Sequence, residues 1–133
     1  MGVRNYTIID IPMTSVAQAY FLGRTLGENN IVLVEDNANM LKDGIFICPP
    51  YVLPRLNDNY DLVLNVDSFT EMNESFQNMY RDFIKDHTNI FFSINHEQNK
   101  NTVGEIFANV ATKTIRNMYP QRRGYLEETF FFK

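Results

Sequence analysis

The chain has 133 residues, 44% of them apolar, and a net charge of -4. These values fit one folded domain and exclude a disordered or fibrous protein, while the negative charge argues against nucleic acid as a partner. A single cysteine, Cys48, excludes an intrachain disulfide and a Cys-rich metal site. We find neither an apolar leader nor a run of about 18 apolar residues, so we expect a cytoplasmic protein with no membrane partner.

The beginning of the chain predicts a strand followed by a helix. Residues 6–11 are rich in strand-forming side chains, and residues 16–26 have the composition of a helix. Thr14 or Ser15 is positioned to cap this helix, and Gly27 to end it. The residues expected to face a sheet are Val16, Ala19, Tyr20 and Gly23.

Residues 31–34 predict a second strand, which ends in the acidic pair Glu35-Asp36. The region that follows, residues 37–59, contains three prolines that oppose regular structure. Only residues 44–48 within it have strand character. We therefore expect a connecting loop with an extended core.

Residues 61–66 form the next predicted strand. Its run Leu62-Val63-Leu64 does not alternate with polar residues, which predicts a strand covered on both faces. A helix is expected over residues 74–86. Ser68 or Asn73 can cap this helix, with Glu71 completing a capping box after Ser68.

The last part of the chain predicts a strand over residues 89–94, a helix over residues 103–118, and a final antiparallel strand at the sheet edge over residues 124–132. Several β-branched residues weaken the helix prediction. Alternating strands and helices indicate an α/β fold with a mostly parallel, doubly wound sheet and helices on both faces. We expect residues 1–133 to form a single domain.

Polar side chains follow three of the predicted strands. Asp10 can accept hydrogen bonds from a ribose, although a capping or turn role is equally consistent with its position. Asn65 and Asp67 follow the third strand, and Asn95 and His96 the fourth. If these two strands are neighbours, their side chains converge on one rim, which is then a candidate pocket.

The rim contains groups that can move a proton. His96 is a candidate general base, and a solvated loop histidine is the alternative. Asp67 and Glu71 can polarise or deprotonate a hydroxyl, or share a divalent cation. No ligand spacing specific to a metal is present, so we predict no metal site. Acyl transfer, nucleotide hydrolysis and zinc peptidase motifs are absent from the sequence.

The chain resembles the sugar O-methyltransferase family of class I S-adenosylmethionine-dependent enzymes, mainly over residues 6–98. The resemblance lies in the residues 6–12 with their acid Asp10, in Asp61-Leu62-Val63-Leu64-Asn65 with Ser68-Phe69-Thr70-Glu71-Met72, and in the strand that ends at Asn95. It implies S-adenosylmethionine as cofactor, a sugar or glycoconjugate as acceptor and a Rossmann-like fold. The implied cofactor-binding residues are Asp10, Ile11, Asn65 and Val66. The implied substrate-binding residues are Ser68 and Asn95.

One departure from the family is large. The family's first strand and Gly-rich turn should precede the strand of Asp10, yet only five residues precede residue 6 and no GxGxxG-like motif occurs. In the family this strand lies between the second and fourth strands. The resemblance therefore implies the carboxyl-terminal portion of such an enzyme with a missing N-terminal segment, or else a chain in which the strand of Asp10 pairs directly with the strand of Asp61. Self-association into a homo-oligomer is a further expectation.

Two other functions remain open from the sequence. An acid after a second strand also suits an NAD-binding or nucleotide-sugar-binding Rossmann-like domain. A fragment without catalytic activity that acts as an interaction module is the third interpretation. The motif Ser68-x-x-Glu71-Met72 favours methyl transfer over the NAD-binding or nucleotide-sugar-binding alternative.

Overall fold

The computed structural model describes residues 3–34, 43–98 and 100–133. The chain divides into two compact units, Met1–Leu56 and Asn57–Lys133, each with its own sheet. Both units combine strands with helices, which confirms the predicted α/β class. None of the helices in the described part of the chain is long and apolar enough to cross a membrane.

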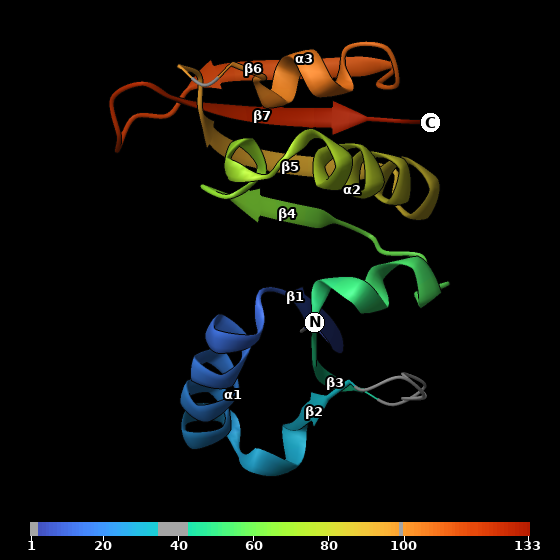
Figure 1. The fold of residues 1–133 in the computed structure, drawn as a ribbon, viewed down its shortest axis with the longest axis vertical. Helices are drawn as coiled ribbons and strands as arrows, with labels where there is room; N and C mark the ends of the chain where they lie inside the picture. The colour runs from blue at the N-terminus through green and yellow to red at the C-terminus, as the bar shows by residue number, and fades with distance from the viewer. Residues whose placement is uncertain (1–2, 35–42, 99) are drawn as a thin grey trace. The chain divides into compact units, whose positions relative to one another are not determined.

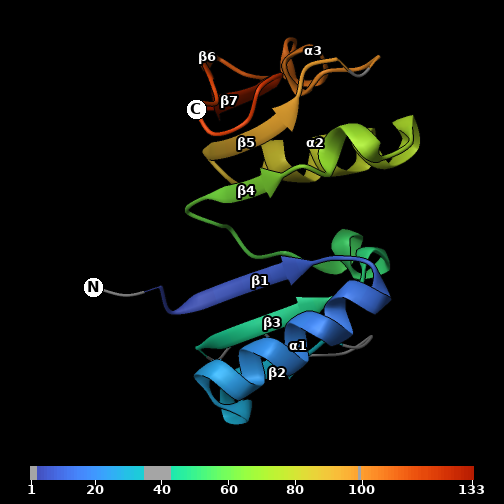
Figure 2. The same cartoon turned by 90° about the vertical axis from the view of Figure 1, so that its left-hand side faces the viewer.

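The first unit contains a parallel sheet of three strands, β1 (Asn5–Ile9), β2 (Ile31–Leu33) and β3 (Gly44–Cys48). Their order is β1-β3-β2, and Figure 2 shows β1 and β3 running in the same direction. The extended core that we expected within the connecting region, residues 44–48, is β3, and this strand is the centre of the sheet. Phe46, Ile47 and Cys48 are buried there, and this burial stabilises the strand. The nearby prolines lie beyond the end of the strand and do not interrupt it. Residues 35–42 lie outside the described residues.

The helix of this unit, α1 (Pro12–Leu26), begins earlier than predicted. Ile11 is its N-cap residue, and no side chain of Thr14 or Ser15 caps it. Pro12 stands in the first turn, where its fixed φ suits a helix and its missing N–H is not needed. Gly27 ends the helix with a φ of 98°, as predicted.

The predicted sheet-facing side of α1 is only partly right. Gly23 is buried, whereas Val16 and Tyr20 are 69% and 73% exposed. A Cβ at Gly23 would lie 3.8 Å from Ile31 Cγ1, which is ordinary van der Waals contact, so α1 packs against the start of β2 at this position. Val16 and Tyr20 lie on the opposite, exposed side of the helix.

The second unit contains a mixed sheet of four strands in the order β4-β5-β7-β6, as Figure 1 shows. The strands are β4 (Val63–Val66), β5 (Ile90–His96), β6 (Lys113–Met118) and β7 (Tyr125–Phe131). β4 and β5 are parallel neighbours, which confirms the condition for a shared rim. β7 is antiparallel as predicted, but it lies inside the sheet, and β6 is the edge strand.

The helix α2 (Glu74–His87) follows β4 and is capped by Asn73. The Oδ1 atom of Asn73 accepts a hydrogen bond of 3.0 Å from the backbone N–H of Phe76. Of the two predicted caps, Asn73 is therefore the correct one. Ser68 instead precedes a short 3-10 helix, η3 (Phe69–Glu71), and its side chain makes no capping bond.

The predicted helix over residues 103–118 is wrong in its second half. Only α3 (Val103–Phe107) is α-helical, with a capping box between Thr102 and Glu105. The β-branched residues beyond it favour strand geometry, and β6 pairs with β7 over its whole length. Two further 3-10 helices, η1 (Glu28–Asn30) and η2 (Pro50–Arg55), complete the elements of the first unit.

A cluster of aromatic rings forms the core of the second unit. The ring of Phe107 lies 4.8 Å from that of Phe91 and 5.1 Å from that of Phe130, measured between centroids. Phe69 lies 5.6 Å from Phe107, so α3, η3 and two strands meet at one point. Both α2 and α3 contribute to this cluster from the same face of the sheet (Figures 1 and 2).

The other face of this sheet is more open than predicted. Leu62 and Leu64 are 54% and 50% exposed, so the prediction of a strand covered on both faces is wrong for this run. Side chains alternate along β4, and only Val63 and Asn65 point towards the helices. Because β4 is an edge strand, it also has no neighbour on one side.

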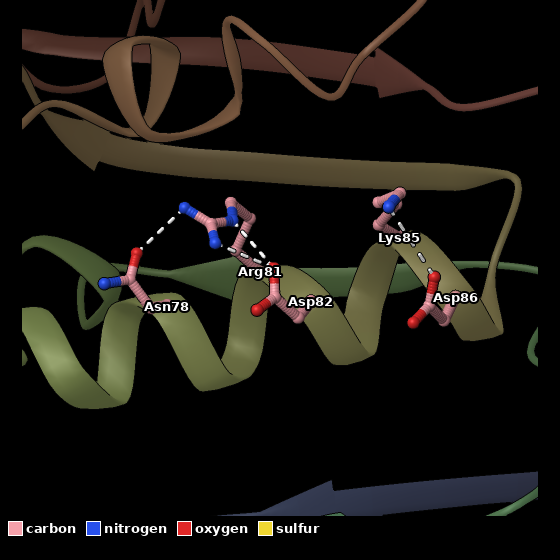
Figure 3. Close-up of polar contacts among 5 residues, drawn as sticks. All are labelled: Asn78, Arg81, Asp82, Lys85 and Asp86. Atoms are coloured by element: carbon pink, nitrogen blue, oxygen red, sulfur yellow. Dashed lines mark hydrogen bonds and ion pairs between the residues drawn. The ribbon is translucent and has the colours of Figure 1, made fainter.

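The outer surface of α2 is polar. Arg81 donates hydrogen bonds to Asn78 and Asp82, and Lys85 lies 4.0 Å from Asp86 (Figure 3). Exposed pairs of this kind contribute little to stability, on the order of 0–1 kcal/mol each. These side chains make the side of α2 that faces away from the core polar.

A buried carboxylate, Glu128, fastens β7 to its neighbours. Its Oε1 atom lies 3.2 Å from Nε of Arg116 on β6, and the backbone of Gly104 also hydrogen bonds to it. Burial raises the pKa of Glu128, and Arg116 opposes this shift. A Cβ at Gly104 would lie 2.8 Å from Glu128 Oε1, so α3 can approach the carboxylate only with glycine there.

Candidate functional site at the ends of two parallel strands

The candidate site lies where β4 and β5 end in the second unit. Asn65 and Asn95 belong to neighbouring parallel strands, and Ser68 and Asp67 follow β4 directly. The structure thus brings Asn65, Ser68 and Asn95 together, as the convergence of strand ends predicts. Val66 ends β4 with its side chain half exposed.

Hydrogen bonds between the two asparagines build the floor of the site. Nδ2 of Asn95 donates to Oδ1 of Asn65 at 2.9 Å, and Nδ2 of Asn65 donates to Oγ of Ser68 at 2.7 Å. Both amide oxygens also accept from the backbone N–H of Phe69, at 3.1 and 3.2 Å. The asparagines therefore hold the chain where it turns from β4 into η3. The hydroxyl of Ser68 still has its proton to donate.

Asp67 occupies a backbone conformation that is rare outside glycine, with a φ of 56°. Asp is among the residues that tolerate this region. Its carboxylate accepts a 2.6 Å hydrogen bond from the hydroxyl of Tyr125 and another of 2.6 Å from Nη1 of Arg122. Through Asp67, the end of β4 is connected to the turn between β6 and β7.

These contacts change the proton affinities at the site. The Tyr125 hydroxyl, followed by the Arg122 guanidinium, lowers the pKa of Asp67 below its ordinary value. The same hydrogen bond raises the pKa of Tyr125, because ionisation would place two negative oxygens together. Asp67 is thus an anion held by two donors, and it can act as a base only after releasing them.

His96 packs beside the same turn. Its ring meets the ring of Tyr125 edge-on, with centroids 5.1 Å apart, and its Nδ1 accepts a 3.1 Å hydrogen bond from the backbone N–H of Gln98. A backbone N–H can only donate, so the neutral ring carries its proton on Nε2. A Cβ at Gly124 would lie 2.9 Å from this Nε2, and the φ of 82° at Gly124 also favours glycine. In this conformation neutral His96 offers a donor rather than a base.

Glu71 completes the set of predicted catalytic residues. Its side chain is exposed at the end of η3, and its charge acts on the Tyr125 hydroxyl, so it lies near the other groups. Within the described part of the chain, its carboxylate accepts no hydrogen bond from another side chain. Of the three predicted catalytic groups, Glu71 is thus the carboxylate available to an incoming hydroxyl.

Arg122 and Tyr125 are site residues that the sequence analysis did not identify. The guanidinium of Arg122 lies over the ring of Tyr125, 4.1 Å from its centroid, in a cation–π contact. The sequence marks Arg122 only as half of a basic pair. The glycine at position 124, between that pair and Tyr125, is the signal for a tight turn that would return these residues to the strand ends.

Asp10 and Ile11, the other predicted cofactor-binding residues, belong to the first unit. They follow β1, and Ile11 is the N-cap of α1. The carboxylate of Asp10 accepts hydrogen bonds from the Ile11 N–H at 2.7 Å and from Nε2 of Gln18 at 2.9 Å. Each oxygen of Asp10 accepts one of these bonds and keeps a lone pair for a further donor. Asp10 therefore does not cap α1 but holds the turn before it, and this role is compatible with ligand binding.

A hollow of about 730 Å³ lies at the opposite end of the sheet of the first unit. Its lining includes Arg4, Tyr6 and Gly44, which stand at or near the amino ends of β1 and β3. Asp10 follows the carboxyl end of β1 and does not line it. The hollow is therefore separate from the predicted ribose-binding position.

The contacts of Asp67 predict a particular dependence of stability on pH. A lowered pKa in the folded state stabilises the fold above the ordinary Asp value of 3.8, and this contribution disappears as the pH falls through the folded-state pKa. We expect Asp67→Asn to remove this part of the acid dependence. Urea unfolding midpoints at about pH 7 and about pH 3 provide the measurement.

Asp61→Asn is the matched control, because the Asp61 carboxylate makes no hydrogen bond in the part of the chain that the structure describes. If the two variants lose the same fraction of acid dependence, the contacts of Asp67 do not stabilise the fold.

No protein-family model and no curated protein matches this sequence. Among solved structures, the chain is similar to the crystal structure of Thermoplasma acidophilum 1320, with a TM-score of 0.45 and 12% sequence identity. The similarity covers 98% of this chain and 78% of that one. A similarity at this level supports no argument about fold or function.

Proposed function

We propose that this chain is the carboxyl-terminal portion of an S-adenosylmethionine-dependent enzyme that methylates a sugar hydroxyl. The observation that carries the proposal is the polar rim at the ends of β4 and β5, where Asn65, Ser68 and Asn95 form a floor beside Asp67 and Glu71. Sites of open α/β sheets lie at such strand ends. The motif that the chain shares with the family, Ser68-x-x-Glu71-Met72, supplies part of this rim.

The edges of the two sheets support the Rossmann-like, doubly wound fold within this proposal. β1 and β4 are each an edge strand of their own sheet, so each sheet by itself can accept a further strand at that edge.

The residues of this chain fit the ribose end of the cofactor. The Asp10 carboxylate keeps lone pairs for ribose hydroxyls, and Oε1 of the neighbouring Gln18 is buried without a hydrogen-bond partner in the described structure. When bound, S-adenosylmethionine supplies a methyl group on a positively charged sulfur, which a hydroxyl oxygen can attack. In this proposal Asn65 and Val66, at the end of β4, are further residues that would hold the cofactor.

The rim residues then have distinct roles in the proposed reaction. Two residues position the acceptor sugar. Ser68 offers its hydroxyl proton, and Asn95 acts through its hydrogen bonds to the floor of the site. Glu71 takes the proton that the attacking hydroxyl loses. Asp67 holds Arg122 and Tyr125 beside the site through two hydrogen bonds. His96 offers its Nε2–H as a hydrogen-bond donor.

A thermal unfolding scan with S-adenosylhomocysteine tests this proposal, with NAD as the control ligand. A ligand at about 100 times its dissociation constant stabilises the folded state by about 2.7 kcal/mol, which raises Tm by several degrees. We expect a shift with S-adenosylhomocysteine alone, and we expect Asp10→Ala to remove it. Glu28→Ala, which changes an exposed acid elsewhere in the first unit, should leave the shift unchanged.

A shift with NAD alone would support the dinucleotide-binding alternative instead. No shift with either ligand, in a chain that unfolds cooperatively, would contradict the proposal that this polypeptide holds the cofactor. A shift that persists in Asp10→Ala would refute the ribose assignment only.

A further inference from the structure

The hollow of the first unit lies between the carboxyl-terminal half of α1 and the amino ends of β1 and β3. Figure 2 shows α1 on one face of this sheet. The volume of the hollow, about 730 Å³, is within the range of about 300–1,000 Å³ that is usual for small-molecule sites. Asp10 does not line it, and Asn65 and Asn95 belong to the second unit, so the hollow is separate from the proposed methyl-transfer site.

The wall of the hollow is apolar. Leu22 and Leu26 stand about one turn apart on α1, so they share a face of that helix. Tyr6 and Ile45 are paired in the parallel register of β1 and β3, which places their side chains on the same face of the sheet. Leu26 and Tyr6 are 51% and 49% exposed. A ligand with an apolar group would therefore remove apolar surface from water here.

Two opposite charges, Arg4 and Asp43, stand at the amino ends of these strands. Each comes one position before the register pair of Asn5 with Gly44. The N–H of Gly44 also donates a 3.0 Å hydrogen bond to the carbonyl oxygen of Arg4. Arg4 and Asp43 are therefore neighbours on adjacent strands, about 5 Å apart at the backbone. Both line the hollow, and within the described residues neither charged group makes an ion pair or a side-chain hydrogen bond.

This pair of charges indicates the class of ligand. Arg4 would attract a phosphate or another simple anion, but Asp43 would repel it, and a simple cation would meet the reverse. A free α-amino acid carries a carboxylate and an ammonium on the same carbon, so it can pair with both side chains at once. A guanidinium binds a carboxylate through two parallel hydrogen bonds, and an ammonium has three N–H donors for a carboxylate.

We propose that the hollow binds a free α-amino acid with a large apolar or aromatic side chain. The carboxylate of the ligand pairs with Arg4, and its ammonium pairs with Asp43. Its side chain lies against Leu22, Leu26 and the ring of Tyr6. The two charges fix the orientation of the ligand, and the apolar wall supplies the contact area. A residue inside a peptide chain carries neither backbone charge, so internal segments of proteins are not ligands.

Titration of the isotope-labelled 133-residue chain with L-phenylalanine, followed by nuclear magnetic resonance, tests the proposal. We expect a dissociation constant on the order of 1 mM or lower, the affinity that a ligand of this size can reach. Two analogues provide the comparison: 3-phenylpropionate lacks the ammonium, and phenethylamine lacks the carboxylate. Each should bind at least about tenfold more weakly than phenylalanine, because one charge of the hollow is then left unpaired.

Substitutions show which side chain binds which group of the ligand. Arg4→Gln should weaken the binding of phenylalanine about tenfold but not that of phenethylamine, which has no carboxylate. Asp43→Asn should weaken the binding of phenylalanine similarly but not that of 3-phenylpropionate, which has no ammonium. Arg24→Gln and Glu28→Gln are the matched controls, because they change exposed charges of the first unit that do not line the hollow. Both controls should retain binding.

All four substituted positions are exposed, so circular dichroism should show every variant folded. Signals that do not change with phenylalanine at about 10 mM would overturn the proposal. Equal binding of phenylalanine and both analogues, or equal weakening by the control substitutions, would overturn it as well. None of these results depends on S-adenosylhomocysteine, so failure of this proposal and failure of the methyl-transfer proposal are distinguishable.

Discussion

Phe107→Ala is expected to lower the free energy of unfolding by about 3–5 kcal/mol, the usual cost of removing a buried aromatic ring. Phe107 is fully buried, and its ring contacts Phe69, Phe91 and Phe130 from three different elements. Its loss leaves a cavity that these rings can fill only by moving out of their present packing. Urea unfolding followed by circular dichroism measures the change.

Ile115→Ala is the control for this cavity. Ile115 lies on β6, and its side chain is 42% exposed, so its removal should cost much less than the removal of Phe107. If the two variants lose equal stability, the aromatic cluster is not the stabilising core of the second unit. A broadened transition would instead indicate that the two units unfold separately.

Asn95→Leu is expected to destabilise the chain by about 2–4 kcal/mol, although the two side chains have the same number and branching of heavy atoms. Asn95 is buried and donates to Asn65 and Ser93 while accepting from the N–H of Phe69. Leucine can replace none of these bonds, and each buried polar group left without a partner costs about 1–3 kcal/mol. The midpoint and slope of urea unfolding measure this loss.

The control for this change is Asn117→Leu on β6, where the asparagine is exposed and water can replace any lost bond. We expect a change within about 0.5 kcal/mol for that variant. Ligand binding separates two roles of Asn95. If Asn95→Leu remains folded and still binds S-adenosylhomocysteine as the natural chain does, the asparagine floor stabilises the turn without forming part of the cofactor site.

Local sequence patterns predicted the elements that depend on neighbouring residues. Gly27 ended α1 as expected, and Asn73 capped α2, because a cap depends on a few adjacent backbone groups. The strands that end near Asn65 and Asn95 were recognisable from their strand-forming residues. Their parallel pairing then brought together the polar residues that follow them.

Longer-range competition decided the elements that the sequence misplaced. Residues 113–118 form a strand because β7 pairs with them along their whole length. A prediction from residues 113–118 alone cannot take this distant partner into account. β3 lies at the centre of its sheet because two strands pair with it. Tyr20 is exposed because α1 packs on its sheet through the opposite side, where Gly23 is buried beside Ile31.

The sequence by itself determined the α/β class, the end of α1 at Gly27, and the polar residues that terminate β4 and β5, whereas the structure decided between Ser68 and Asn73 as the cap of α2. Only the tertiary structure decided which of those groups are free to act. Asp67 became an anion held by Tyr125 and Arg122, residues that lie more than fifty positions away along the chain. Pairing of β5, β7 and β6 creates that contact, and a hydrogen bond between distant residues leaves no periodic signal in the sequence around either partner.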